Sequence, residues 1–487
     1  MNKSPDTRKD FDPANWDDFR AQGHKIFDDM VNDLAGLRER EHAWRPMDAD
    51  AIAPFTAGLP QEGKGLEGAY EDFSTQLRPH PMGLSHPRWW GWAGGSGTPD
   101  GMIANMISAA FHSPNIIFHH GGYFAELQVL EWFKEIFGFS SDASGNLVSG
   151  GSMANFAGVH VARHAKAGEH IRKQGIDAPK YTVYGSVETH YSVPKALDVL
   201  GLGSDNFRKI PVDENYRIDI PALKAAIAED RKAGLKPIAI SANAGTIKTG
   251  ATDPLEELSD IAKAEDLWLH CDGAFGAMAI LSGKYKHLVK GIERVNSLAF
   301  DLHKWLSQPY EAGGILIQPG KWLEATNSYS ATYVSKLPGS ITDIPSVFSH
   351  RGVELSRGFR AFPFWFTMKA FGAKAFGDII TRNIEDAQYL AALVKETPLI
   401  ELMAPVPMNV VNFRYIGRGD IPENKLNDLN IAILTQIQRR GIAIPSSEMI
   451  DGKFSIRVCN LNHRTTRDDF DLLVKSAVEI GQELESA

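Results

Sequence analysis

Two polar residues, Asp272 and Lys304, each end a short apolar run, and together they suit one kind of chemistry. A lysine amine can bond to an aldehyde, and a carboxylate can keep a pyridine nitrogen protonated so that the ring accepts electrons. Pyridoxal phosphate is the cofactor that needs both groups. The pair therefore predicts a pyridoxal phosphate site in which Lys304 is the Schiff-base lysine and Asp272 is the partner of the ring nitrogen.

The two runs are expected to be buried parallel strands, because open α/β sheets bind ligands at the carboxyl ends of such strands. Helical patterns alternate with short strand patterns between about residues 97 and 375. This alternation is typical of a mostly parallel sheet covered by helices, and it predicts an α/β fold. The expected strands are 146–148, 181–184, 237–242, 267–271, 297–300 and 314–317.

The segments before and after this region have different patterns. Residues 14–39 form an amphipathic helix that must cover another surface, and the Gly- and Pro-rich residues 53–84 are expected to be a linker or extended arm. Strands at 410–415 and 454–459 and helices at 422–440 and 466–484 indicate a small α+β domain. We therefore divide the chain into an N-terminal helical arm and dimerisation segment (1–96), a large cofactor-binding domain (97–375) and a small C-terminal domain (376–487).

Composition excludes several classes of protein. No apolar run approaches the roughly 18 residues that span a bilayer, and the N-terminus lacks the apolar core of a signal peptide, so we expect a cytoplasmic protein without a membrane partner. The net charge of −9 argues against a nucleic acid partner. Cys271 and Cys459 are too few for a disulfide framework and lie in expected strands, and no metal site is expected.

Gly150, Gly151 and Ser152 follow the expected strand 146–148 and lead into a helical stretch at 153–165. Backbone N–H groups at the N-terminus of a helix bind phosphate well. The position after a strand favours a phosphate site for the cofactor. Taken alone, the same residues would also suit an ordinary helix start.

The order of these motifs resembles the group II pyridoxal phosphate-dependent amino acid decarboxylases, a family that includes the aromatic-L-amino-acid decarboxylases. The resemblance covers roughly residues 70 to 470, and it implies a fold type I, transferase-like architecture and a homodimer whose N-terminal helices pack across the dimer. Its landmarks in chain order are 86–92 (HPRWWGW), 149–155 (SGGSMAN), 188–193 (ETHYSV), 244–246 (AGT), the two apolar runs, and 354–360 (ELSRGFR).

The resemblance also implies roles at the cofactor. His190 would stack over the pyridine ring and reach the substrate carboxylate, Ala274 would pack against one face of the ring, and Asp301 and His303 would lie near the phosphate or its waters. Structural alternatives stay open, namely a helix cap for Asp272, a turn hydroxyl for Thr246 and a carboxylate that holds backbone N–H groups for Asp301. The full set is Gly151, Ser152, His190, Thr246, Asp272, Ala274, Asp301, His303 and Lys304.

At the substrate, the resemblance implies that Trp92, Ala93 and Gly94 line the pocket, where a flat indole could receive an aromatic side chain. Packing of the arm is the alternative for the neighbouring tryptophans. Tyr333, in the polar stretch 329–345, would protonate the product after carbon dioxide leaves and would reach the site of the partner subunit. The implied catalytic set is Lys304, His190, Tyr333 and Asp272.

The sequence therefore predicts a lyase that removes carbon dioxide from the α-carbon of an L-amino acid, with aromatic substrates favoured over acidic or small aliphatic ones. The alternatives are a decarboxylating aldehyde synthase, another pyridoxal phosphate-dependent carbon–carbon lyase, and a dimeric scaffold without activity. Retention of Tyr333 and His190 argues against the aldehyde synthase. Retention of Lys304 and Asp272 argues against the scaffold.

Overall fold

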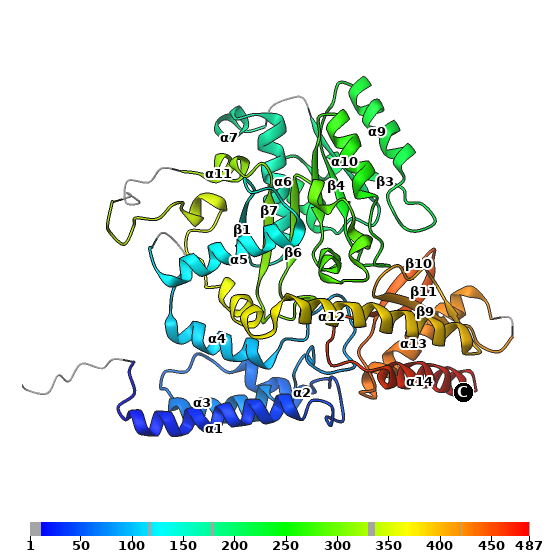
Figure 1. Ribbon diagram of the computed structural model, residues 1–487. Coiled ribbons are helices and arrows are strands. Elements are labelled where there is room, and N and C mark those ends of the chain that lie inside the picture. The colour runs from blue at the N-terminus through cyan, green and yellow to red at the C-terminus, as the bar shows by residue number, and fades with distance from the viewer. Residues whose placement is uncertain (1–10, 115–117, 177–179, 330–336, 420, 487) are drawn as a thin grey trace, which may run out of the picture.

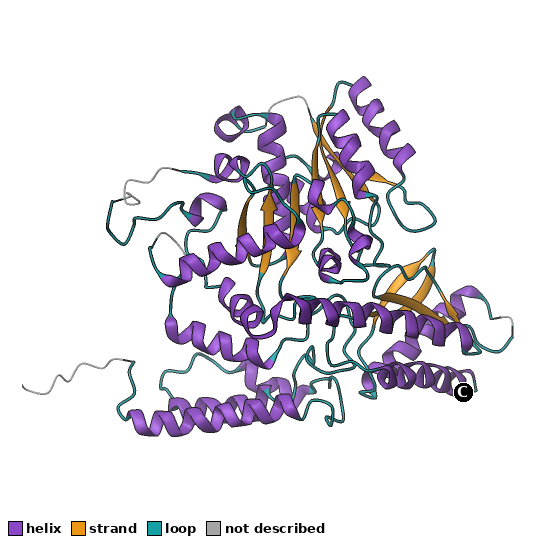
Figure 2. Cartoon of the chain, viewed as in Figure 1, coloured by secondary structure: helices purple, strands orange, loops and turns teal. Residues whose placement is uncertain are grey.

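The computed structural model describes residues 11–114, 118–176, 180–329, 337–419 and 421–486. At its centre is a seven-stranded sheet in the order β1-β7-β6-β5-β4-β2-β3 (Figures 1 and 2). The strands are β1 (Ser144–Val148), β2 (Tyr181–Ser186), β3 (Phe207–Ile210), β4 (Lys236–Asn243), β5 (Trp268–Asp272), β6 (Ser297–Asp301) and β7 (Gly313–Ile317).

Strands β6, β5, β4, β2 and β3 pair in parallel, and β7 is antiparallel to both of its neighbours. The predicted mostly parallel α/β sheet is therefore confirmed, and each predicted strand is present. All residues of β5 and β6 are buried, which explains why both read as continuous apolar runs rather than as alternating patterns. The short strand β3 was not predicted.

Helices cover both faces of this sheet. One buried cluster joins α6 and α8 to the sheet, and a second cluster joins it to α5, α9, α10 and the first half of α12. The sheet is thus buried on both sides, as parallel sheets require. The helices of this region are α4 (Pro99–Phe111), α5 (Gly121–Phe137), α6 (Gly151–Ala167), α7 (His170–Gln174), α8 (Ser192–Val199), α9 (Ile220–Lys232), α10 (Leu255–Ala264), α11 (Lys321–Asn327) and α12 (Ala361–Glu396).

A second, four-stranded antiparallel sheet lies near the C-terminus in the order β10-β11-β9-β8 (Figure 1). Helix α12 breaks at Gly372 (φ 75°, ψ 157°), close to the domain boundary that we expected at 376, and its residues from Ala387 onward pack into the core of this smaller sheet. Strands β8 and β10 were not predicted. The elements are β8 (Ile400–Leu402), β9 (Val410–Tyr415), α13 (Glu423–Arg439), β10 (Ser446–Ile450), β11 (Lys453–Cys459) and α14 (Arg467–Glu485).

The N-terminal arm begins with the predicted amphipathic helix, α1 (Trp16–Ala35). The expectation of an extended linker over 53–84 is wrong, because this stretch contains α3 (Gly65–Asp72) and a π-helical turn over Phe73–Leu77, and the short α2 (Ala49–Ile52) leads into it. The apolar residues Leu66, Tyr70, Phe73 and Leu77 recur at helical spacing within it, and the Gly- and Pro-rich flanks masked that signal.

The tryptophans of 86–92 join this arm to the smaller sheet. The indole of Trp90 is fully buried, its N–H donates to Thr465 Oγ1 at 3.1 Å, and its ring lies 5.0 Å from that of Phe470. Trp89 is also buried and pairs with Ile444 through a β-bridge. Packing therefore explains Trp89 and Trp90. Across the described ranges, no helix combines the length and apolarity needed to cross a bilayer.

Candidate active site

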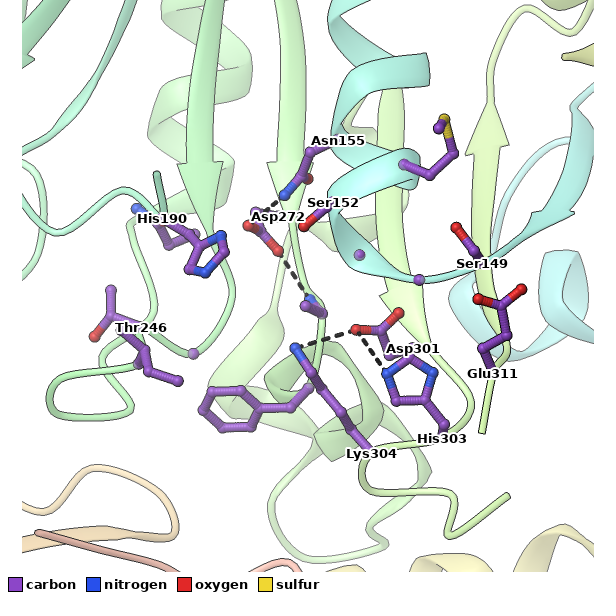
Figure 3. Close-up of a pocket in the computed structure, with 18 of the residues that line it drawn as sticks. Ser149, Ser152, Asn155, His190, Thr246, Asp272, Asp301, His303, Lys304 and Glu311 are labelled. Carbon is purple, nitrogen blue, oxygen red and sulfur yellow. Dashed lines mark hydrogen bonds and ion pairs between the residues drawn. The ribbon is translucent and has the colours of Figure 1, made fainter. Parts of the chain in front are cut away.

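A pocket of about 340 Å³ lies at the carboxyl ends of β4, β5 and β6, where Asn243, Asp272 and Asp301 end these strands (Figure 3). The topology thus brings together residues that are far apart in the sequence. All nine residues expected at the cofactor line it, namely Gly151, Ser152, His190, Thr246, Asp272, Ala274, Asp301, His303 and Lys304.

Lys304 reaches this pocket from the turn after β6 and is held by a carboxylate. Its Nζ lies 3.1 Å from Asp301 Oδ2 (Figure 3). Burial favours the neutral amine, but the charges of Asp301 and Asp272 outweigh it and raise the pKa of Lys304. Before it can bond to an aldehyde, this amine must therefore give up its proton.

Asp272 is buried at the end of β5, and each of its carboxylate oxygens accepts one hydrogen bond. Asn155 Nδ2 donates to Oδ2 at 2.7 Å, and the backbone N–H of Ala274 donates to Oδ1 at 3.1 Å. The local bond to Ala274 forms a turn and caps no helix, because the 3-10 helix that follows begins at Gly276 with Phe275 as its N-cap and without a side-chain cap. The long-range bond from Asn155 serves no cap, and it holds the carboxylate at the pocket wall.

His190 lines the pocket on the side away from Ser149 and Glu311 (Figure 3). Burial lowers the pKa of its imidazole, so the ring is neutral near pH 7. Its Nδ1 accepts the backbone N–H of Ser192 at 3.3 Å, which places the proton of the neutral ring on Nε2. The ring can therefore donate a hydrogen bond through Nε2.

The start of α6 forms a cradle for an anion. Gly150 precedes this helix with no side-chain cap, so the first N–H groups have no intrahelical acceptor. A Cβ atom on Gly151 would lie 2.9 Å from Asp301 Oδ2 and 3.2 Å from Ala274 Cβ, and one on Gly150 would lie 3.1 Å from His303 Cε1. Only glycine leaves this space open.

The donor set fits pyridoxal phosphate. The cradle suits the phosphate, Asp272 suits the ring nitrogen, and Lys304 suits the aldehyde. His303 adds a fixed N–H group, because its Nδ1 accepts the backbone N–H of Ala312 at 3.1 Å while its Nε2 faces Asp301 at 3.7 Å. Thr246 is buried, and its hydroxyl lies 3.3 Å from that of Thr249, which agrees with a turn hydroxyl as well as a cofactor neighbour.

Asp301 lies beside the anion cradle, which agrees with the expected place near the phosphate, but within the described ranges it does not take the alternative role of holding backbone N–H groups. Among the described residues, its side chain pairs with Lys304 and His303 and holds no backbone N–H group. Its other carboxylate oxygen, Oδ1, is buried and has no hydrogen-bond partner among the residues that the structure describes. The carboxylate therefore serves as the counter-ion of Lys304.

The expected substrate residues lie apart from this pocket. Trp92 is 58% exposed, Ala93 is buried in the core, and neither they nor Gly94 line the pocket wall. The next residue, Gly95, packs against the loop of Lys304, because a Cβ atom there would lie 2.2 Å from the Lys304 carbonyl oxygen. Tyr333 lies outside the described residues.

Sequence reasoning missed several residues that line the pocket. Asn155 and Ser149 lie inside a quoted motif, but a neutral polar side chain gave no chemical signal. Glu188 begins the motif 188–193, and its Oε1 pairs with Lys248 Nζ at 2.7 Å. The full set of missed residues is Ser149, Met153, Asn155, Glu188, Asn243, Gly245, Ile247, Phe275 and Glu311.

The two arginines of 354–360 have different surroundings. Arg357 is buried and forms an ion pair with Glu126 of α5. Arg360 binds Glu354 and also Glu311, a residue that lines the pocket. Arg360 therefore supports one side of the pocket, whereas Arg357 ties the turn before α12 to α5.

Comparison with known proteins places this arrangement in a family. Residues 51–416 match the family model described as the pyridoxal-dependent decarboxylase conserved domain. The chain belongs to this family. The resemblance to group II decarboxylases is thereby confirmed, as is pyridoxal phosphate as the cofactor of a carboxy-lyase.

Three curated relatives span most of the chain. The aromatic-L-amino-acid decarboxylase of Bacillus atrophaeus is 33% identical and covers 96% of both chains. The L-2,4-diaminobutyrate decarboxylase of Rhizobium meliloti is 27% identical over 88% of this chain and 84% of its own. The phenylacetaldehyde synthase of Petunia hybrida is 27% identical over 91% and 90%. These relatives differ in the substrate or product that their names give.

Among solved structures, that of Oryza sativa TDC with PLP and tryptamine superposes with a TM-score of 0.89. It covers 98% of this chain and 100% of its own at 20% identity. This similarity supports the fold type I architecture. At 20% identity it supports the fold and not the substrate or the reaction.

The ion pair between Asp301 and Lys304 yields a prediction about cofactor loading. Because Asp301 raises the pKa of Lys304, Asp301→Asn should lower it and leave a larger fraction of neutral amine at a given pH. The rate at which apoenzyme captures pyridoxal phosphate, followed by stopped-flow absorbance, should therefore reach half its maximum at a lower pH. Asp213→Asn, at a partly exposed ion pair with Arg217, is the control. An unchanged pH midpoint would contradict the counter-ion role.

Proposed function

We propose that this enzyme removes the α-carboxylate of an L-amino acid, with aromatic amino acids favoured, and releases the amine and carbon dioxide. One observation carries the reaction type, namely that Lys304, Asp272 and His190 come from separate strands and loops to one pocket. The relative that is 33% identical across nearly the whole chain supports the aromatic substrate class. The cytoplasmic location stays a prediction.

Each of these residues has a distinct task. When bound, pyridoxal phosphate supplies an aldehyde for the amine and a protonated ring that accepts the electron pair of the broken bond. Lys304 holds the cofactor until substrate arrives, and the Asp272 carboxylate keeps the proton on the ring nitrogen. The Nε2–H of His190 donates to the substrate carboxylate and holds it for departure.

A panel of the twenty amino acids, assayed for amine and carbon dioxide, tests this proposal. We expect aromatic amino acids to give the highest kcat/KM. Lys304→Ala should lower turnover by roughly a thousandfold or more, because the covalent link to the cofactor is lost. Lys290→Ala, at an exposed lysine, is the matched control and should retain wild-type rates.

Borohydride reduction of the wild-type enzyme should label a peptide that contains Lys304. A label on another lysine would overturn the assignment of this residue. Absence of both amine and carbon dioxide from every amino acid, with cofactor bound, would contradict decarboxylation and favour the non-catalytic scaffold.

The similarity to a phenylacetaldehyde synthase favours one alternative reaction on the same scaffold. In that reaction, amino acid, dioxygen and water give aldehyde, carbon dioxide, ammonia and hydrogen peroxide. We propose that Tyr333, carried over from the family resemblance, commits this chain to amine by giving its phenolic proton to the α-carbon. Once the α-carbon is protonated, dioxygen can no longer react with it.

Tyr333→Phe keeps the aromatic ring but removes this acidic hydrogen. The variant should release carbon dioxide with little change in KM, while aldehyde, ammonia and peroxide replace amine as products. Parallel assays of all four products under air, and again without dioxygen, check this. Tyr329→Phe is the matched control, because this nearby tyrosine lies in the same polar stretch. An unchanged amine yield per carbon dioxide would show that Tyr333 does not donate the proton.

We also propose that the active unit is a homodimer. Helix α1 is amphipathic, yet none of its residues is buried in the single chain, and Trp16 and Phe19 are largely exposed. The nearby helix α4 likewise exposes Met106 and Phe111 (Figure 1). Apolar surface of this extent on the arm suits a second copy of the chain.

If Tyr333 serves the site of the partner subunit, two variants that form no amine alone should complement each other. Lys304→Ala and Tyr333→Phe subunits, mixed under conditions of exchange, would form heterodimers with one intact site. Amine production should recover to about a quarter of the wild-type rate, since half of the dimers are mixed and half of their sites are intact. Differently tagged subunits would verify exchange. No recovery after verified exchange would place Tyr333 at its own subunit's site.

A further inference from the structure

Asn155 is a fully buried residue of helix α6 that touches the pocket but carries no charge (Figure 3). Its amide uses all of its main hydrogen-bonding positions. Nδ2 donates to Asp272 Oδ2 at 2.7 Å and to Ser192 Oγ at 2.8 Å, and Oδ1 lies 2.9 Å from His270 Nε2. The side chain of α6 thus joins two groups of strand β5, Asp272 and His270, to Ser192 at the start of α8.

The charge of Asp272 fixes which way this amide points. A flipped amide would set its oxygen against the carboxylate at 2.7 Å, where two acceptors repel. The amide oxygen must therefore face His270 and accept a proton from its Nε2. His270 is fully buried, and burial lowers its pKa to about 4, so it is neutral and carries one ring proton.

The other end of the His270 ring completes the chain of donors. Its Nδ1 must accept, and Ser297 Oγ lies 2.8 Å away to donate. The Ser297 oxygen in turn accepts the indole N–H of Trp268 at 2.8 Å. Donors therefore run in one direction from Trp268 through Ser297, His270 and Asn155 to the carboxylate of Asp272.

Helix α6 leaves room for this imidazole. A Cβ atom on Gly158 would lie 2.4 Å from both Cε1 and Nδ1 of His270. Gly158 lies on the same face of α6 as Asn155, close to one turn further along. The close approach of helix and strand thus depends on a glycine opposite His270.

A second branch leads from Asn155 to His190. Ser192 Oγ accepts from the amide of Asn155 and lies 2.8 Å from His190 Nδ1, to which it can donate its hydroxyl proton. The backbone N–H of Ser192 points at the same Nδ1. Both donors keep the His190 proton on Nε2, on the side of the ring that faces away from Ser192.

We propose that Asn155 is the positioning residue that aligns Asp272 and His190 together, and that His270 holds its amide in place. The proposal deepens the proposed function and rests on it, because it assigns Asp272 to the cofactor ring and His190 to the substrate. One neutral side chain then sets the direction of the two groups that act on cofactor and substrate.

Asn155→Leu tests the branch to Asp272, since leucine has nearly the same shape but no donor. In apoenzyme titrated with pyridoxal phosphate, the dissociation constant should rise roughly 10- to 100-fold, the effect of losing a hydrogen bond to a charged group. The same substitution in an Asp272→Asn background should add less than about threefold, because the partner is already changed. A wild-type dissociation constant, or full additivity, would overturn the proposal.

Ser192→Ala separates the second branch from the first. It leaves the bond from Asn155 to Asp272 in place, so the cofactor dissociation constant should stay within about threefold of wild type. The kcat/KM for substrate should fall roughly tenfold, because the proton of His190 is no longer held on Nε2 by the hydroxyl. Equal losses in cofactor affinity and in kcat/KM would show that Ser192 only supports the fold.

His270 offers a test by rescue. Gln retains an N–H group that can donate to the Asn155 oxygen, whereas Phe fills the space without a donor. His270→Phe should weaken cofactor binding about as much as Asn155→Leu, and His270→Gln should recover most of the affinity. Equal affinity in the two variants would overturn the role of His270. Asn430→Leu, at a buried asparagine of α13, should lower the unfolding midpoint without changing cofactor affinity.

These readouts keep the two proposals distinguishable. If the wild-type enzyme binds pyridoxal phosphate but releases no carbon dioxide from any amino acid, the proposed function fails while the affinity tests on Asn155 still decide its role toward Asp272. If the wild-type enzyme decarboxylates and the Asn155→Leu variant binds cofactor normally, the positioning role alone fails.

Discussion

The hydrogen bond from Asn155 to the carboxylate of Asp272 is the interaction on which the rest of the site depends. A buried carboxylate costs several kcal/mol unless donors compensate it. The protein supplies two, one from the neighbouring backbone of Ala274 and one from a helix more than a hundred residues earlier in the chain. The second bond connects strand β5 to α6, and α6 is also the element that forms the anion cradle. The carboxylate expected at the ring nitrogen and the cradle expected for the phosphate are therefore held by one helix.

Strand register explains why Lys304 meets this carboxylate. In the parallel ladder, Asp272 pairs with Asn243 of β4 on one side and with Ala299 of β6 on the other. Both neighbouring strands thus end near Asp272, and Lys304 follows β6 by a short turn. A slip of one residue would turn Asp272 to the opposite face of the sheet, away from the pocket. The continuous apolar runs that identified the strands therefore also fix where the chemistry lies.

Much of this arrangement could be predicted from sequence, and the exceptions have physical reasons. Strands β5 and β6 were predictable because burial on both faces favours apolar runs. Asp272 and Lys304 at or just after their ends were predictable as site residues because a charged group at such a position has few possible functions. Asn155 and His270 were not predictable as partners, because only the closure of α6 onto the sheet brings them within 2.9 Å. The helix α3 was missed because glycine and proline surround it, and the placement of Trp92 outside the pocket depends on how the arm folds back.

The residues expected at the cofactor belong to a different part of the molecule from Trp92, expected at the substrate, and Tyr333, expected to protonate the product. The cofactor residues lie at the ends of strands or at the start of α6, where the sheet holds them. Trp92 lies in the arm, and Tyr333 lies in the polar stretch that follows α11 in the sequence. Such a separation lets substrate preference change without loss of the cofactor cradle. It accounts for relatives of similar length whose names give an aromatic amino acid, diaminobutyrate and phenylacetaldehyde. The groups suited to the cofactor are therefore held by the sheet and by α6, apart from the arm and from the stretch after α11.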